Sequence, residues 1–167
     1  MIPVGGELPS RTKPLVTYGL IAVNVLIFAL TYGSVRASDG GVADRWGFVP
    51  ADIRPLSVLT HMFLHDGVAH VFFNMLYLFI FGGKVEEAFG RLGYIALYLG
   101  TGVLAVFGHY ALYPHSTVPA VGASGAISGL LGAYLFLFPR NRIRVFSFFG
   151  FYPRLFTMPA GGLLAFY

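Results

Sequence analysis

The sequence predicts an all-α integral membrane protein, a polytopic bundle of transmembrane helices. Of its 167 residues, 56% are hydrophobic and only 11% are charged, whereas a soluble domain has about 25% charged residues. The charged residues lie between long apolar runs, which is the pattern that membrane topology produces. We therefore expect contact with the lipid bilayer and no binding of nucleic acid, although the net charge is +4.

The apolar runs predict at least four complete spans and part of a fifth. They cover residues 15–32, 67–83, 92–112 and 121–138, and a last run begins near Leu155 and stops at Tyr167. Because a helical crossing takes about 20 residues, the last run is too short. Residues 33–60 predict an interfacial loop with Trp46 as its aromatic anchor, and KVEEAFGR predicts a charged turn. We treat residues 1–167 as one membrane domain, incomplete at its C-terminus.

The basic residues predict the orientation of the spans. With the N-terminus in the cytoplasm, eight Lys and Arg residues fall inside, and only Arg36, Arg45 and Arg54 fall outside. This excess agrees with the positive-inside rule and fits a multi-pass protein of a bacterial inner membrane. His70, at the start of the second span, and Ser124, at the start of the fourth, then both lie near the outer face.

Ser124 is the first candidate for chemistry, because it stands at the head of the fourth apolar run, in VGASGAISGLLGAYLFLF. A hydroxyl in the first turn of a helix lies beside N–H groups without helical partners and at the positive end of the helix dipole. Donors aligned in this way can stabilise an oxyanion on a substrate carbonyl, and Gly122 and Gly125 leave room for a substrate backbone. The glycines also have a structural explanation, since small residues let helices pack closely in lipid.

His70 and Asn74 are the second candidates, four residues apart in the second apolar run. This spacing places them on one helix face, and such residues inside a span are a functional hypothesis by default. A hydrogen-bonded pair between helices is the structural alternative. Zinc is another alternative, because His61 and His65 have the i, i+4 spacing of zinc ligands. However, HMFLH lacks the glutamate of the HExxH motif, and we expect neither a metal nor a cofactor.

Three segments, in this order, resemble the rhomboid family of intramembrane serine proteases: HMFLHDGVAHVFFNM, FGGKVEEAFGR and VGASGAISGLLGAYLFLFPRNRIR. The resemblance covers residues 11–167 and implies a rhomboid-like bundle that cleaves other transmembrane proteins in or near their spans. It implies that Ser124 is the nucleophile and that His70 and Asn74 help to form the oxyanion hole. The positions that we interpret as structural are His61, His65 and Glu86.

The resemblance also points to a missing group. A serine needs a base to become a nucleophile near neutral pH, and in rhomboids this base is a histidine on the sixth span. No histidine of this chain occupies that place, so we expect the base beyond residue 167. The alternative function is a non-catalytic rhomboid-like subunit of a larger assembly. A transporter or channel is a further alternative, but it would require ionisable residues along several spans, and these spans contain almost none.

The small-residue face of the fourth run leads to an expectation about partners. Gly125 and Gly129 gain nothing from contact with lipid alone. We therefore expect a further helix to pack on them, either from later in the protein or from another membrane chain. We also expect that residues 1–167 alone neither cleave peptides nor react with a fluorophosphonate that traps activated serines.

Overall fold

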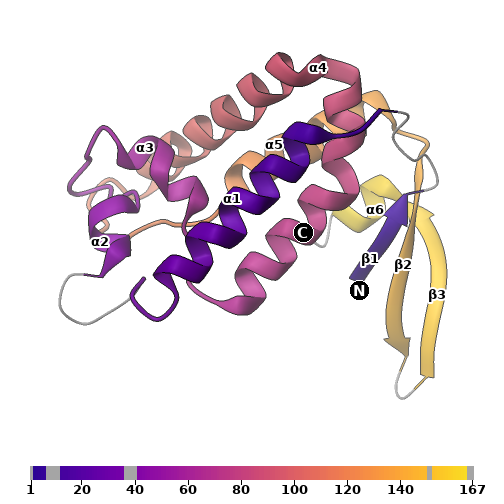
Figure 1. The fold of residues 1–167 in the computed structure, drawn as a ribbon, viewed down its shortest axis with the longest axis horizontal. Coiled ribbons are helices and arrows are strands. Elements are labelled where there is room, and N and C mark those ends of the chain that lie inside the picture. The colour runs from indigo at the N-terminus through magenta and orange to yellow at the C-terminus, as the bar shows by residue number, and fades with distance from the viewer. Residues whose placement is uncertain (1, 7–11, 36–40, 150–151, 165–167) are drawn as a thin grey trace.

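A computed structural model describes residues 2–6, 12–35, 41–149 and 152–164. Within these residues the protein is mostly helical, with one small sheet at its edge (Figure 1). The elements in chain order are β1 (Ile2–Gly6), α1 (Leu15–Thr31), α2 (Val42–Trp46), α3 (Ser57–Thr60), the 3-10 turn η1 (His61–Phe63), α4 (Val68–Leu112), α5 (Ser124–Leu137), β2 (Arg142–Phe149), β3 (Tyr152–Pro159) and α6 (Ala160–Leu164). Arg11, Arg36 and Tyr167, which enter the predicted orientation and the predicted fifth run, lie outside the described residues.

Helix α4 is bent into two arms at Gly90. This residue has φ 68° and ψ 167°, a conformation that glycine adopts readily because it has no Cβ. The first arm comprises residues 68–89 and the second arm residues 91–112. The predicted turn KVEEAFGR is corrected here, because the helix continues through these residues as far as Gly90.

The predicted spans correspond to helices of unequal length. Among the described helices, α4 alone is long and apolar enough to cross a membrane. Helices α1 and α5 are apolar but have 17 and 14 residues, fewer than the roughly 20 of a typical crossing. The structure therefore agrees with the positions of the first four apolar runs and does not confirm four complete spans.

Helix α1 is fixed to α4 by one buried carboxylate. Glu86 is 4% exposed and accepts hydrogen bonds from the backbone N–H groups of Val16 and Thr17, at 3.0 and 2.8 Å, and from the Thr17 hydroxyl, at 2.8 Å. Val16 and Thr17 belong to the first turn of α1, where N–H groups have no partner within the helix. Glu86 thus caps α1 from a different helix, which confirms its structural role.

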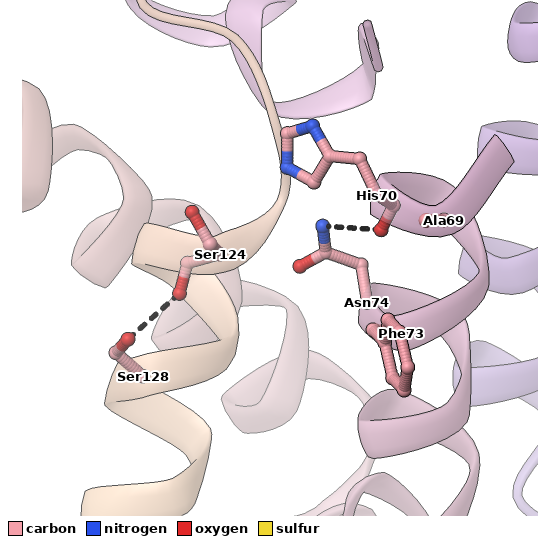
Figure 2. A pocket seen from close by; sticks show the side chains of 6 residues that line it. All are labelled: Ala69, His70, Phe73, Asn74, Ser124 and Ser128. Atoms are coloured by element: carbon pink, nitrogen blue, oxygen red, sulfur yellow. Dashed lines mark hydrogen bonds between the residues drawn. The ribbon is translucent and has the colours of Figure 1, made fainter. Parts of the chain in front are cut away.

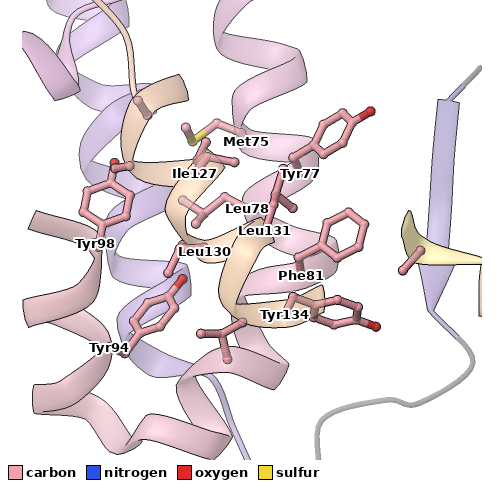
Figure 3. Packing of buried hydrophobic residues seen from close by; sticks show 14 of the residues in the cluster. Met75, Tyr77, Leu78, Phe81, Tyr94, Tyr98, Ile127, Leu130, Leu131 and Tyr134 are labelled. Carbon is pink, nitrogen blue, oxygen red and sulfur yellow. The ribbon is translucent and has the colours of Figure 1, made fainter. Parts of the chain in front are cut away.

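The core lies between α5 and the two arms of α4 (Figure 3). Its largest buried side chains are Phe81 of the first arm, Tyr94 and Tyr98 of the second arm, and Tyr134 of α5. Aromatic rings of this size remove much apolar surface from the surroundings and leave few voids. The packing therefore fixes α5 in the angle between the two arms.

Two glycines bring α5 against the second arm of α4. A Cβ at Gly125 would lie 2.5 Å from the Cβ of Ala105, and a Cβ at Gly129 would collide with Thr101. The Thr101 hydroxyl also donates to the backbone carbonyl of Ala126, at 3.2 Å. This corrects the expectation that Gly125 and Gly129 await a helix from elsewhere, since the chain itself already covers them.

The exposed face of α5 is not the face that contains Gly125 and Gly129. Ser124, Ser128 and Gly132 are exposed, and they follow one another at intervals of four residues along one face of the helix. A Cβ at Gly132 would meet nothing within 4 Å. Within the described part of the chain, this face is where another helix has room to pack.

The prediction of an all-α protein is wrong in one respect. Strands β1, β2 and β3 form an antiparallel sheet with β2 in the centre. Along β2, Ile143 and Val145 are buried whereas Arg142 and Arg144 are exposed, which is the two-residue period of a half-buried strand. The apolar run predicted to begin a fifth span near Leu155 forms β3, and helix α6 starts only where that strand ends.

Candidate active site

A cavity of about 540 Å³ lies between the start of α4 and the start of α5. The residues that line it are Ala69, His70, Phe73 and Asn74 from α4, and Ser124 and Ser128 from α5 (Figure 2). The fold thus brings the three predicted site residues, Ser124, His70 and Asn74, to the walls of one cavity. The rest of α4 and the loop that follows it separate Asn74 from Ser124 in the sequence.

Ser124 is the first residue of α5, as the sequence predicts. The N-cap is Ala123, and no side chain caps this end of the helix. Ser124 is exposed, and so is Ser128 one turn further along. The Ser128 hydroxyl donates to the backbone carbonyl of Ser124, at 2.8 Å. Of the two serines in the cavity, Ser124 is therefore the one at the positive end of the helix dipole.

Asn74 lies on the wall opposite Ser124. Its amide nitrogen donates to the backbone carbonyl of His70, at 3.0 Å, while the amide oxygen is on the side of α5 (Figure 2). An amide nitrogen carries two hydrogens. The second hydrogen is the one that can serve a substrate oxygen.

His70 is held between a carboxylate and a glycine. Its Nδ1 lies 2.7 Å from Oδ1 of Asp66. Its Nε2 faces Gly122 so closely that a Cβ there would be 2.6 Å away. Gly122 has φ 119°, a conformation that side chains disfavour. The sequence predicts that Gly122 leaves room for a substrate backbone. In the structure, the His70 ring occupies the space beside Gly122.

The segment before α5 is fixed by the predicted interfacial loop. Phe48, which is fully buried, and Ala120 donate to each other's backbone carbonyls, at 3.0 and 2.8 Å. The N–H of Gly122 donates to the carbonyl of His61, at 2.8 Å. These bonds hold Gly122 under the His70 ring.

His61 and His65 lie behind the cavity wall rather than in it. The Nδ1–H of His61 donates to the Ser57 carbonyl, at 3.0 Å, and burial lowers the pKa of His61. His65 is fully buried, with its ring centroid 5.0 Å from that of His70. Burial, assisted by the electrostatic effect of His70, lowers the pKa of His65 to about 4. Among the described residues, no three side chains of metal-binding type converge.

Sequence reasoning missed Asp66. The signal was present, since Asp66 stands four residues before His70, the spacing that places two residues on one helix face. However, Asp66 precedes the first residue of α4, Val68, and a helical spacing does not by itself predict contacts across a helix start. Of the other histidines, His109 and His115 do not line the cavity.

Comparison with known proteins supports one family. Residues 54–166 match the Rhomboid domain. The chain is 34% identical over 139 residues to "Rhomboid protease GluP" of Bacillus subtilis (strain 168), an alignment that covers 78% of this chain and 26% of GluP. It is 39% identical over 129 residues to YdcA of the same organism, whose name also contains the words rhomboid protease, with 76% and 64% covered.

A human relative is also similar. The "Presenilin-associated rhomboid-like protein, mitochondrial" of Homo sapiens is 30% identical over 149 residues, which are 87% of this chain and 38% of that protein. The chain spans less than two thirds of the length of each of these three relatives. The family match covers the loop from residue 54, both arms of α4, and α5, which include the elements that build the cavity. The chain therefore belongs to the rhomboid family of integral membrane proteins.

Proposed function

We propose that the protein is a serine endopeptidase of the rhomboid type, which hydrolyses peptide bonds in or near the transmembrane segments of other membrane proteins. The observation that supports this most strongly is the cavity in which Ser124, at the start of α5, faces His70 and Asn74. The names of GluP and YdcA support a protease.

In the proposed reaction, the Ser124 hydroxyl oxygen attacks the carbonyl carbon of the substrate peptide bond. The carbonyl oxygen becomes an oxyanion, which the N-terminus of α5, Nε2–H of His70 and an N–H of Asn74 stabilise. Collapse of this intermediate breaks the C–N bond and leaves an ester on Ser124. Water then hydrolyses the ester and restores the free serine.

The proposed general base is a histidine beyond residue 167. It takes the proton of Ser124 and returns it to the leaving amine. Two observations support this placement: Asp66 already engages His70, and the exposed face of Ser124, Ser128 and Gly132 leaves room beside the serine. Small residues on such a face allow a second helix to approach closely.

The proposed topology has four spans, formed by α1, the two arms of α4, and α5, with the N-terminus in the cytoplasm of a bacterial cell. Single cysteines at the exposed positions Thr117 and Arg140 should then react with an impermeant reagent from opposite sides of the membrane. Reaction of both positions from one side would contradict this orientation.

The function is tested with the full-length protein and a reporter substrate that contains a transmembrane segment. Ser124→Ala should abolish cleavage, because no other hydroxyl stands at that helix start. Ser128→Ala is the matched control and should retain cleavage, since its hydroxyl bonds to the helix backbone. Cleavage by the Ser124→Ala variant at the rate of the unmodified protein would end the assignment.

A further inference from the structure

We propose that Asp66 is a positioning residue, which holds His70 as a doubly protonated imidazolium with Nε2–H directed toward the oxyanion beside Ser124. The inference rests on the proposed function, in which His70 is an oxyanion donor. It is based on one juxtaposition: Asp66 contacts the Nδ1 edge of the ring, at 2.7 Å, while the Nε2 edge lies over Gly122, two residues before Ser124.

The number of protons on His70 decides whether the ring can perform this role. A carboxylate only accepts hydrogen bonds, so its contact with Nδ1 requires a proton there. A neutral imidazole has one ring proton, which leaves Nε2 as an acceptor that cannot bind an oxyanion. Only the doubly protonated ring donates from Nε2 and keeps its bond to Asp66, and a charge-assisted bond stabilises that form.

The described surroundings of His70 contain one other imidazole nearby, that of His65. His65 is buried, and its pKa of about 4 keeps it neutral at pH 7, so it neither holds nor neutralises the charge of His70. The remaining neighbours carry no carboxylate or amine: Gly122, Ser124 and Asn74 around the cavity, and Phe28 and Tyr32 where α1 approaches Asp66. Asp66 is therefore the carboxylate that faces this ring within the described part of the chain.

The imidazolium keeps both protons throughout the reaction, so its contribution is stabilisation of negative charge and not proton transfer. That charge appears only as the tetrahedral intermediate forms. An interaction made only in the transition state raises kcat and leaves substrate binding nearly unchanged. Asp66, acting through His70, should therefore affect kcat rather than KM.

The kinetic test uses the full-length protein in detergent micelles. At pH 7.5, Asp66→Asn should lower kcat by about 10- to 100-fold, with KM unchanged, which is less than the roughly 10²–10³-fold loss when an oxyanion donor itself is removed. Asp66→Glu should recover part of the activity. The control is Asp52→Asn, which removes an exposed carboxylate paired with Arg54, at 2.9 Å, and should leave kcat unchanged.

A second measurement needs no variant and no substrate. Nitrogen-15 chemical shifts of labelled histidine report the protonation of each ring nitrogen, and at pH 7 both nitrogens of His70 should be protonated. A neutral His70 ring, or an Asp66→Asn variant with the kcat of the unmodified protein, would overturn the inference. If Ser124→Ala is inactive while Asp66→Asn is unaffected, only this inference fails. If Ser124→Ala still cleaves, the proposed function fails, and the nitrogen shifts decide separately whether Asp66 holds the cation.

Discussion

Each end of the first arm of α4 places polar side chains at the N-terminus of a neighbouring helix. The two ends differ in whether that helix N-terminus is capped by a side chain or faces a cavity. At the cytoplasmic end of the proposed topology, Glu86 caps the first turn of α1 with three hydrogen bonds and is 4% exposed. At the other end, His70 and Asn74 face the first turn of α5, where no side chain caps the helix and Ser124 is exposed. One helix start is closed and the other faces a cavity.

The difference shows that a polar residue in an apolar span does not reveal its role by type alone. Glu86 and His70 lie on the same arm, and each serves a helix start. A buried carboxylate whose oxygens are all satisfied has nothing to offer a substrate, and its removal affects stability. Polar groups at an open, uncapped helix start can act on a substrate, and their removal affects rate. Substitutions at the two ends should therefore change different measurements.

The largest effect is expected at the open end, from Gly122→Ala. The new methyl group would displace the Nε2 edge of His70. The alanine would also have to adopt the φ of 119° of Gly122, a conformation that residues with a side chain disfavour. Cleavage by the full-length protein should fall by about 10²–10³, the loss typical of one oxyanion donor. Gly108→Ala is the matched control, because a Cβ there meets nothing within 4 Å, and it should retain full activity. Equal activity of the two variants would show that the contact between Gly122 and His70 is unimportant.

The next effect is expected at the closed end and concerns stability. Glu86→Ala leaves the N–H groups of Val16 and Thr17 buried without their partner, so the free energy of unfolding should fall by about 3 kcal/mol. Glu87→Ala removes the partner of Lys84, at 3.1 Å and nearer the surface, and should cost less than about 1 kcal/mol. Denaturant unfolding in detergent micelles measures both. If Glu86→Ala were as stable as Glu87→Ala, the cap on α1 would contribute nothing.

The smallest expected effect is on the pH dependence of the free energy of unfolding, and it comes from His65. The pKa of His65 is about 4 in the folded protein and about 6.5 in an unfolded chain. The unfolded state therefore binds more protons between these values, and stability falls as the pH drops below 6.5. From pH 7.5 to pH 5 the loss should be about 2 kcal/mol. Replacement of His65 by Phe should remove this part of the pH dependence, and an unchanged pH dependence would exclude His65 as its source.

The sequence predicted the parts of the site that depend on local pattern. The position of Ser124 follows from the start of an apolar run, and the shared face of His70 and Asn74 follows from their spacing. The contacts of Asp66 and Gly122 with His70 were missed, because they depend on how a loop enters α4 and on a close approach between segments far apart in the sequence.

The errors in the fold have a similar cause. The sheet was missed because it pairs β2 with β1, a strand near the opposite end of the sequence, although Ile143 and Val145 alternate with arginines. The continuation of α4 through KVEEAFGR was missed because charged residues suggest exposure, whereas Glu86 is buried against the start of α1. Both depend on partners that a local window does not contain.

We propose that Ser124, and no other serine of the cavity, is the nucleophile. A fluorophosphonate forms a covalent bond with the oxygen of an activated serine, and mass spectrometry of the full-length protein identifies the modified residue. The account predicts that Ser124 is modified, in proportion to the loss of cleavage, and that Ser124→Ala abolishes the modification. Modification of Ser128 instead, or an unmodified Ser124 in a protein whose cleavage the reagent has stopped, would contradict it.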